Sequence, residues 1–331
     1  IYIPDRLKEG YGPNKLAIDF FSSKGIDTFI TVDCGATSIE PMIYAKSKGM
    51  NSIIIDHHKV DNDLPVSYAH INPSRDEDSS GLNDLAAVGL TFIFIVGLRR
   101  AIRDKNIFPE IKEPSLKQYL DLVALGTVCD VVQLKGLNRG FVKEGIEIIS
   151  RYSRLGIEAL KSISGSKEIG VTELGYRIGP RINAAGRTGA SDLGFRLLTS
   201  DSEDEVLAIS ERLNNLNKQR QNIEETVLFE AINIIEDNIS NKKLNTIPNS
   251  LIALGENWHL GVLGIVASRL KDKYYRPSFV ISDSEGKLTG SARSISGIDV
   301  GKLIIKGVNK KLLLSGGGHK MAAGFSLNHN T

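Results

Sequence analysis

The sequence predicts an α/β protein: a parallel sheet flanked by helices, a long connecting helix, and a second, smaller α/β domain. Two apolar, β-branched runs at 27–35 and 51–58 are separated by a helical pattern at 38–50. This order is typical of a βαβ unit with parallel strands. A polar stretch at 202–240 has apolar positions at helical spacing and contains no proline or glycine, so it predicts the long helix.

Other segments complete the expected fold. Helical spacing predicts four further helices, at about 84–104, 115–125, 138–150 and 191–199. The smaller domain should begin with a strand, a helix and a strand, at 251–255, 261–273 and 278–283, and contain two glycine-rich turns. Trp258, the one tryptophan, is predicted to lie in its core. We therefore expect three parts, at 1–200, 201–244 and 245–331.

Size and composition limit the class of protein. With 331 residues and 41% hydrophobic content, the chain can form more than one core. Its two cysteines, Cys34 and Cys129, form no disulfide framework, and each is predicted to pack as a small apolar residue. The longest apolar run, at 85–98, is shorter than the roughly 20 residues that a membrane span needs. We expect a cytoplasmic protein without membrane contact.

Charge is distributed unevenly along the chain. The net charge of the whole chain is only +2, but from residue 246 onward eleven lysines and arginines stand against five acidic residues. This excess favours an anionic partner for the C-terminal part. A solvated basic surface is the alternative.

Acidic and imidazole side chains follow the apolar segments. Asp33 ends the first predicted strand, Asp56, His57 and His58 end the next, and Asp130 ends the apolar run "GTVCDVV". The carboxyl ends of parallel strands share one edge of a sheet, where ligands bind. Carboxylates together with imidazole are ligands for divalent ions such as Mn²⁺ or Mg²⁺. The cysteines lack the spacing of a zinc site.

Basic and glycine-rich stretches indicate phosphate binding. Arg177, Arg181 and Arg187 alternate with glycine, proline and alanine, and guanidinium groups match phosphate geometry. Surface ion pairs are the alternative. "GSARS" supplies Ser291 and Arg293 on a predicted glycine turn. In "SGGGHK" a predicted turn could form an anion-binding nest of backbone N–H groups next to a histidine; the residues concerned are Gly316, Gly317, Gly318 and His319.

"TVDCG", "SIIIDHH" and "LGTVCDVV" resemble motifs of the DHH phosphoesterase superfamily. "YIPDRLKEGYGPN", "YRIGPRINAAGRTG", "WHLGVLGIVASRL", "GSARSI" and "GGGHKMAAGF" narrow the resemblance to the RecJ family of single-strand-specific 5′→3′ exonucleases, over almost the whole chain. The resemblance implies a DHH catalytic domain, a long helix and a DHHA1 domain, with the substrate in the cleft between the domains.

The resemblance also implies roles for individual residues. Asp33 would bridge two Mn²⁺ ions, and His57 and Asp130 would be ligands of one of them, with Mg²⁺ as another possible metal. Asp56 would orient His57, as carboxylates do for metal-bound imidazole, and His58 would face the scissile phosphate. The two metals would activate water and neutralise phosphoryl charge. The 5′-terminal phosphate would bind the side chains and backbone of Ser291, Arg293, Gly317, Gly318 and His319.

Two family features are absent from this sequence, which begins with Ile1 rather than Met. One is a further Asp and His metal motif on a strand that precedes "YIPDR". The other is an OB domain after the DHHA1 domain. We therefore expect an excised core with about half of the metal ligands, weak metal binding and little or no activity.

The function predicted from these observations is metal-dependent 5′→3′ hydrolysis of single-stranded DNA to 5′-mononucleotides, in DNA repair and recombination. The partners implied are single-stranded DNA with a 5′ end, single-strand-binding protein and a RecQ-type helicase, and the protein is expected to be a monomer. One alternative is a DHH phosphodiesterase of cyclic dinucleotides or short oligonucleotides. The other is a non-catalytic nucleic-acid-binding module.

Overall fold

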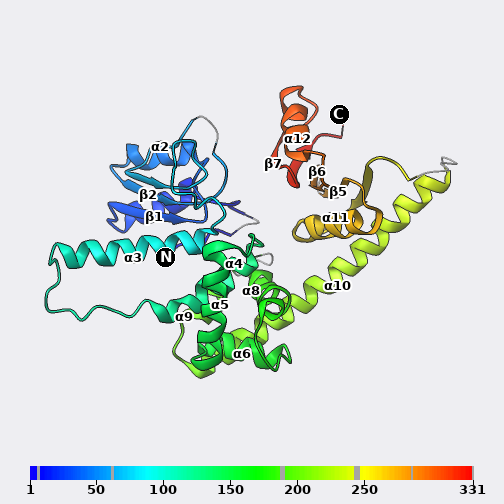
Figure 1. Cartoon of the computed structure of the whole chain (residues 1–331). Coiled ribbons are helices and arrows are strands. Elements are labelled where there is room, and N and C mark those ends of the chain that lie inside the picture. The colour runs from blue at the N-terminus through cyan, green and yellow to red at the C-terminus, as the bar shows by residue number, and fades with distance from the viewer. Residues whose placement is uncertain (6–7, 61–62, 187–190, 242–246, 285, 330–331) are drawn as a thin grey trace. The chain divides into compact units, whose positions relative to one another are not determined.

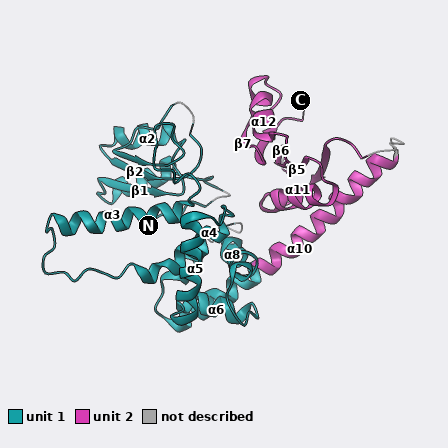
Figure 2. Ribbon diagram, in the orientation of Figure 1, with its two compact units in different colours: residues 1–216 teal, residues 217–331 magenta. Residues whose placement is uncertain are grey.

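The computed structural model describes residues 1–5, 8–60, 63–186, 191–241, 247–284 and 286–329. The chain divides into two compact units, Ile1–Leu216 and Asn217–Thr331 (Figure 2). The division falls inside one long helix, whereas the sequence places the domain boundaries at 200 and 245. Those boundaries stay a prediction.

The first unit combines a small sheet with a group of helices (Figure 1). Its elements are α1 (Lys15–Ser23), β1 (Thr28–Val32), α2 (Ile39–Ser47), β2 (Asn51–Ile55), β3 (Ala69–Ile71), α3 (Ala87–Asp104), α4 (Leu120–Cys129), α5 (Gly136–Arg151), α6 (Leu155–Ile163), α7 (Val171–Glu173), α8 (Gly179–Ala185), α9 (Leu193–Thr199) and the start of α10 (Glu203–Asn241). A 3₁₀ turn at Lys117–Tyr119 precedes α4, and a π-helical turn at Leu174–Ile178 joins α7 to α8.

The sheet confirms the predicted βαβ unit. Its order is β1-β2-β3 with parallel pairing throughout, and Val32 lies opposite Ile55 at the ends of β1 and β2. Figure 1 shows α2 on one side of the sheet and α3 on the other. Successive residues of β2 face opposite sides of the sheet. Ile54 packs in the core with α1 and α2, whereas Ile55 packs with α3. Strand β3, only three residues long, was not predicted.

The helical part of unit 1 has its own core. Leu160, Leu174, Ile178 and Leu197 are fully buried there, together with residues of α4, α5 and α10. Helices α4 and α5 approach each other so closely that only glycine fits at one contact. A Cβ at Gly145 of α5 would overlap the Leu120 carbonyl oxygen of α4. The helices predicted at 84–104, 138–150 and 191–199 correspond to α3, α5 and α9. The helix predicted at 115–125 overlaps α4 only from Leu120 onward, and α1, α6, α7 and α8 were not predicted.

Helix α10 is the predicted long helix, and its 39 residues confirm it. Its apolar positions serve two cores. Val206 and Leu213 are buried in the core of unit 1, whereas Val227 and Ala231 are buried in that of unit 2. One continuous amphipathic pattern therefore supplies both units.

Unit 2 contains a mixed five-stranded sheet with strand order β4-β5-β6-β8-β7, in which β4 and β5 are parallel and the other pairs antiparallel. Its elements after α10 are β4 (Leu251–Glu256), α11 (Leu260–Tyr274), β5 (Ser278–Ser284), β6 (Lys287–Arg293), α12 (Val300–Asn309), β7 (Ser315–His319) and β8 (Ala322–Leu327). Helix α11 shares its core with Leu251 and Val280, and α12 packs with Ala323 and Phe325 on the other face. Trp258 is buried with α10 and α11, as predicted.

The two predicted glycine-rich turns of this unit are wrong. "GSARS" lies largely in β6 and "SGGGH" is β7. Burial alternates along β6, as expected of a strand whose successive side chains point to opposite faces of the sheet. Glycine and alanine at the inward positions conceal that alternation in the sequence. An anion nest in a turn is therefore not formed by these residues.

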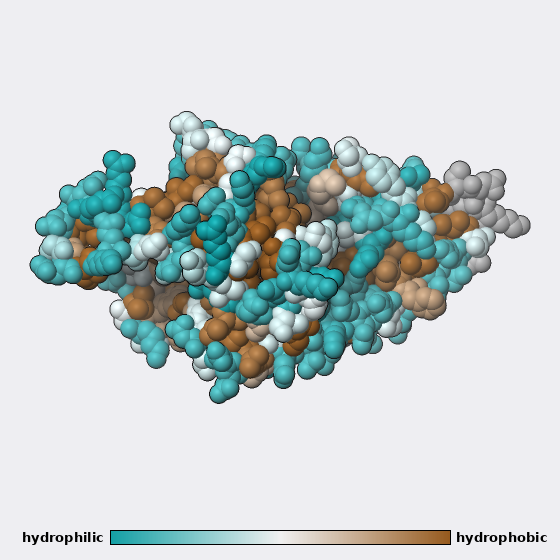
Figure 3. All heavy atoms as spheres, turned by 60° about the horizontal axis from the view of Figure 1, so that its bottom comes forward, coloured by the Kyte–Doolittle hydropathy of each residue, from teal (hydrophilic) through white to brown (hydrophobic). Residues whose placement is uncertain are grey.

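Among the described residues, none of the helices combines the length and the apolar composition that a membrane span requires. On the face that Figure 3 shows, hydrophilic residues cover most of the surface, and apolar residues appear in separate groups between them.

Two glycines of α5 should respond in opposite ways to alanine. Gly140→Ala should raise the free energy of unfolding by about 0.5–1 kcal/mol, because its Cβ would meet open space and alanine is the better helix former. Gly145→Ala should lower it by about 1–3 kcal/mol, because its methyl group would overlap α4. Urea unfolding of both variants measures the difference; equal effects would contradict this packing.

Candidate metal and phosphate sites

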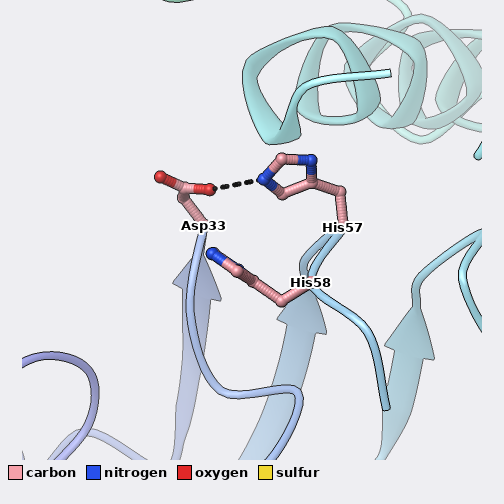
Figure 4. Close-up of side chains that lie close together, drawn as sticks. All are labelled: Asp33, His57 and His58. Carbon is pink, nitrogen blue, oxygen red and sulfur yellow. Dashed lines mark ion pairs between the residues drawn. The ribbon is translucent and has the colours of Figure 1, made fainter. Parts of the chain in front are cut away.

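Five polar side chains that the sequence singles out meet at one edge of the first sheet. Asp33 follows β1, Asp56, His57 and His58 follow β2, and Asp130 ends α4. The imidazole Nε2 of His57 lies 3.4 Å from Asp33 Oδ1 and 3.4 Å from Asp130 Oδ2. Figure 4 shows Asp33 and His57 pointing toward one another, with His58 beside them.

The backbone is unusual beside two of these residues. Asp33 has a φ of 60°, in the left-handed region, and so has Val131, directly after Asp130, with a φ of 59°. Aspartate tolerates this conformation, but for a β-branched residue it is strained. Val131 is 86% exposed, so packing of its side chain does not compensate for the strain. Strained backbone of this kind is typical of functional sites.

Asp56 ties the turn after β2 together from within. The side chain is buried, and one carboxylate oxygen accepts hydrogen bonds from the backbone N–H groups of His57 and His58 and contacts Nδ1 of the His58 ring at 2.7 Å. The other oxygen accepts the N–H of Ala36, in the turn after β1. Burial opposes the charged form, but the hydrogen bonds outweigh it and lower the pKa of Asp56 to about 2.

This arrangement differs from the role expected for Asp56. The carboxylate was expected to orient the ring of His57, but it contacts the ring of His58 and reaches His57 only through the backbone. The same carboxylate oxygen accepts the backbone N–H of His57 and contacts the ring of His58, so the two histidines use it differently. The ring of His57 is instead placed between Asp33 and Asp130.

A second pair of residues, not predicted, supports the same turn from outside. Asn72 follows β3 and donates a hydrogen bond from Nδ2 to the His58 carbonyl oxygen at 2.9 Å. Ser74 donates from Oγ to the His57 carbonyl oxygen at 2.9 Å, and its own N–H is bound by Asn72 Oδ1. Both carbonyl groups of the histidine pair are thus held. The only sequence signal was the short polar segment "INPSR", which has no periodicity.

Tyr11 is a further neighbour that the sequence did not single out. Its hydroxyl donates to the backbone oxygen of Asp33, and its ring lies 6.1 Å from that of His58. The residue occurs in the stretch "YIPDRLKEGYGPN", but nothing in that stretch marked it as part of the site.

The residues at this edge fit a divalent cation. His57 Nε2 makes no hydrogen bond of proper geometry with any described group, although it is buried. Its neighbour Asp33 raises the pKa of His57 most, and burial raises that of Asp130. Asp33 and Asp130 also line a cavity of about 200 Å³ beside the start of α3. Asp33, His57 and His58 each offer a ligand atom within 4.8 Å of the others, and Asp130 Oδ2 lies 3.4 Å from His57 Nε2. Carboxylates together with imidazole nitrogen are suitable ligands for Mn²⁺ or Mg²⁺.

The described arginines of unit 1 that the sequence singles out lie together on the π-helical turn and α8. Arg181 donates from Nη1 to the Arg177 carbonyl oxygen and from Nε to Asn214 Oδ1, and Arg177 donates to the Ser164 carbonyl oxygen. These bonds go to uncharged oxygens, so an anion remains the natural counter-charge. Burial and the nearby Arg177 lower the pKa of Arg181. Arg187 lies outside the described residues.

In unit 2 the sheet register aligns most of the predicted phosphate ligands. Ser291 on β6 pairs with Gly324 on β8, which pairs with Gly317 on β7. Two positions further along the strands, Arg293 of β6 pairs with Ala322 of β8, which in turn pairs with His319 of β7. Because paired residues share a face and faces alternate, the four predicted ligands lie on one face. Gly318 lies on the other, where a Cβ would overlap the Ala322 carbonyl oxygen.

Comparisons with known proteins agree with this organisation. The chain matches the DHH family, N-terminal domain, over residues 1–127, and the DHHA1 domain over residues 230–330. It is 36% identical to the single-stranded-DNA-specific exonuclease RecJ of Haemophilus influenzae, over 98% of this chain and 57% of the relative. The corresponding exonuclease RecJ of Bacillus subtilis is 34% identical, over 98% of this chain and 39% of the relative. The chain therefore spans little more than half the length of the first of these curated relatives, and less of the second.

Solved structures show the same likeness. A crystal structure of exonuclease RecJ bound to manganese superimposes with a TM-score of 0.79 and 31% identity, covering 99% of this chain and 78% of that one. RecJ of Thermus thermophilus in complex with Mn²⁺ gives a TM-score of 0.76 and 31% identity, covering 94% of this chain and 44% of that one.

Removal of the outer support of the histidine turn should be costly. Asn72→Ala should lower the free energy of unfolding by about 1–3 kcal/mol, because buried groups lose their hydrogen-bond partner. It should also shift the NMR signals of both histidine rings. Asn83→Ala, at an exposed position, is the matched control. Equal stability of the two variants would show that the Asn72 bonds contribute nothing.

Proposed function

This chain belongs to the RecJ family of proteins with DHH and DHHA1 domains, and we propose that it hydrolyses single-stranded DNA from the 5′ end in a reaction that depends on a divalent metal. The observation that carries this proposal is the placement of His57 Nε2 at 3.4 Å from the carboxylates of both Asp33 and Asp130. The products are 5′-mononucleotides. Because relatives are considerably longer than this chain, the activity is assigned to the whole gene product.

Asp33, His57 and Asp130 would hold divalent metal, and two Mn²⁺ ions are expected from the family resemblance. A bound divalent ion supplies a Lewis acid that activates water and neutralises charge on the phosphoryl oxygens. Relatives bound to Mn²⁺ and to Mg²⁺ support this choice of ions. The carboxylates of this chain provide the negative charge that attracts them.

The other residues of the edge position and orient groups. Asp56 fixes Nδ1 of His58, which orients the ring so that its Nε2 points away from Asp56. We assign His58 as the hydrogen-bond donor or acid toward the scissile phosphate. Because the pKa of His58 is raised, chiefly by Asp56, the protonated ring that this role needs is favoured.

The phosphates of the strand bind the basic groups. Ser291, Arg293, Gly317 and His319 bind the 5′-terminal phosphate on the shared face of the second sheet, which sets the direction of digestion. Arg177 and Arg181 contact backbone phosphates, and Arg187 is assigned to the same task from the sequence pattern that the three arginines share. Gly318 stays a predicted ligand of the same phosphate through its backbone N–H, because backbone N–H groups lie in the plane of a sheet and not on its faces.

Larger-scale assignments belong to the same proposal. The catalytic domain, connecting helix and substrate domain are placed at 1–200, 201–244 and 245–331. The family resemblance implies single-strand-binding protein and a RecQ-type helicase as partners. A cytoplasmic location is expected from the two cysteines, which form no disulfide framework, and a monomer is expected as well.

Digestion of 5′-phosphorylated single-stranded DNA tests the activity. The full gene product with Mn²⁺ should release mononucleotides from the 5′ end. Asp33→Asn and His57→Ala should each lower the rate at least about 100-fold, since even changes to groups that only support metal ligands cost about 10- to 100-fold. The control is Asp27→Asn, an exposed carboxylate at the other end of β1.

The alternatives correspond to distinct results. Cleavage of cyclic dinucleotides or dinucleotides, with long strands untouched, would replace the exonuclease by a small-substrate phosphodiesterase. Strand binding without cleavage of any substrate would identify a binding module. Unchanged rates in Asp33→Asn would contradict the proposed metal site whatever the substrate.

Salt dependence tests the phosphate contacts separately. The logarithm of the affinity for single-stranded DNA should fall linearly with the logarithm of the salt concentration. Arg293→Ala should reduce the magnitude of this slope by about 0.7, the value for one phosphate contact on a single strand. Lys112→Ala, at an exposed position of unit 1, should leave it unchanged. An unaltered slope in Arg293→Ala would remove that residue from the phosphate site.

A further inference from the structure

We propose that Gly264 of α11 is a positioning residue for the 5′-phosphate site: the lack of a side chain there lets the Arg293 guanidinium lie against the helix, beside Ser291. The inference rests on the proposed function, because it concerns the same phosphate site. It adds a residue from a helix to a site otherwise built from strands.

Gly264 lies inside α11 (Leu260–Tyr274), at a position where the backbone does not need glycine. Its φ is not in the left-handed region, where glycine is favoured. Glycine is a poor helix former in such a position. A reason for glycine must therefore come from what lies against the helix.

The atoms against Gly264 belong to the proposed phosphate site. A Cβ built on Gly264 would lie 2.8 Å from Nη2 of Arg293, 3.1 Å from Oγ of Ser291 and 3.4 Å from Cζ of Arg293. These are the three nearest atoms, and all belong to the two β6 side chains aligned with Gly317 and His319. The first distance is shorter than real Cβ contacts allow. Any other residue at position 264 must displace the guanidinium.

The position of the Arg293 guanidinium is set by few other contacts. Its Nη1 donates to the Ala292 carbonyl oxygen at 2.9 Å and to Ser291 Oγ at 3.3 Å. Burial lowers the pKa of Arg293, and no described carboxylate shifts it. A half-buried guanidinium bonded to uncharged oxygens favours an anion as its partner. Its exact position against α11 then decides how well both N–H groups of its fork reach a phosphate.

Other glycines of this unit are required by close packing within the fold. A Cβ at Gly290 would overlap the Phe325 ring, and one at Gly301 would lie 2.7 Å from the Gly318 carbonyl oxygen. Those neighbours are a packed ring and backbone, which cannot move without disturbing the fold. At Gly264 the closest atom is the end of a flexible side chain. Alanine there should move the guanidinium and leave the fold intact.

The test compares binding of single-stranded oligonucleotides that carry a 5′-phosphate or a 5′-hydroxyl, by fluorescence anisotropy with the full gene product. Gly264→Ala should lower the preference for the 5′-phosphate about tenfold or more, because the bidentate contact is lost. Its unfolding midpoint should not fall, since alanine favours helix. Gly140→Ala, a helical glycine facing open space, should leave the preference unchanged.

A double-mutant cycle with Arg293→Ala shows whether Gly264 acts through that residue. In the Arg293→Ala background, Gly264→Ala should cause no further loss. An equal further loss, or a lowered unfolding midpoint in Gly264→Ala, would identify a glycine needed for other reasons and overturn the inference.

The two levels of the proposal fail separately. If the wild-type protein does not prefer the 5′-phosphate, or Arg293→Ala keeps the preference, the proposed phosphate site itself is wrong. If wild type prefers the phosphate and Arg293→Ala loses the preference while Gly264→Ala retains it, only the role of Gly264 is overturned.

Discussion

The buried carboxylate of Asp56 is the interaction on which the first site depends. It joins the turn after β1, through Ala36, to the turn after β2, through the N–H groups of His57 and His58. Parallel strands bring these turns to the same edge, but pairing alone does not determine the conformation of the residues beyond the last ladder bond. Since every bond to this carboxylate comes from a backbone N–H or an imidazole nitrogen, its charge is stabilised despite burial. Asn72 and Ser74 hold the opposite side of the same turn.

That turn assembles a site whose charges are not balanced. Asp33 and Asp130 both approach one imidazole, and neither distance to His57 Nε2 is that of a well-formed hydrogen bond. Asp33 and Asp130 together carry more negative charge than one protonated imidazole can offset, and a bound divalent cation would supply the balance. The left-handed backbone at Asp33 and Val131 adds a second cost at the same place. Both costs are consistent with residues arranged for a metal rather than for stability.

Small residues, which allow close packing, shape the second sheet, whereas charged side chains shape the edge of the first sheet. Along β6, β7 and β8, glycine and alanine let α11 and α12 approach the sheet closely, and Gly301 and Gly316 owe their identity to that contact. This same property concealed the strands, because residues without side chains carry no alternation of apolar and polar positions. The predicted turns at "GSARS" and "SGGGH" failed for this reason. Helix α10, whose apolar residues recur at helical spacing over its whole length, was predicted to within one residue at each end.

Local periodicity and the order of elements were enough to predict the βαβ unit, the long helix and the residues that follow the strands. The partners of those residues depend on how the elements pack. Asp56 binds the ring of His58 rather than that of His57, Asn72 supports the turn from just after β3, which was not predicted, and Gly264 lies against Arg293. A periodic sequence pattern does not predict these contacts. They depend on the direction in which each ring points, on sheet register and on how closely a helix approaches a strand.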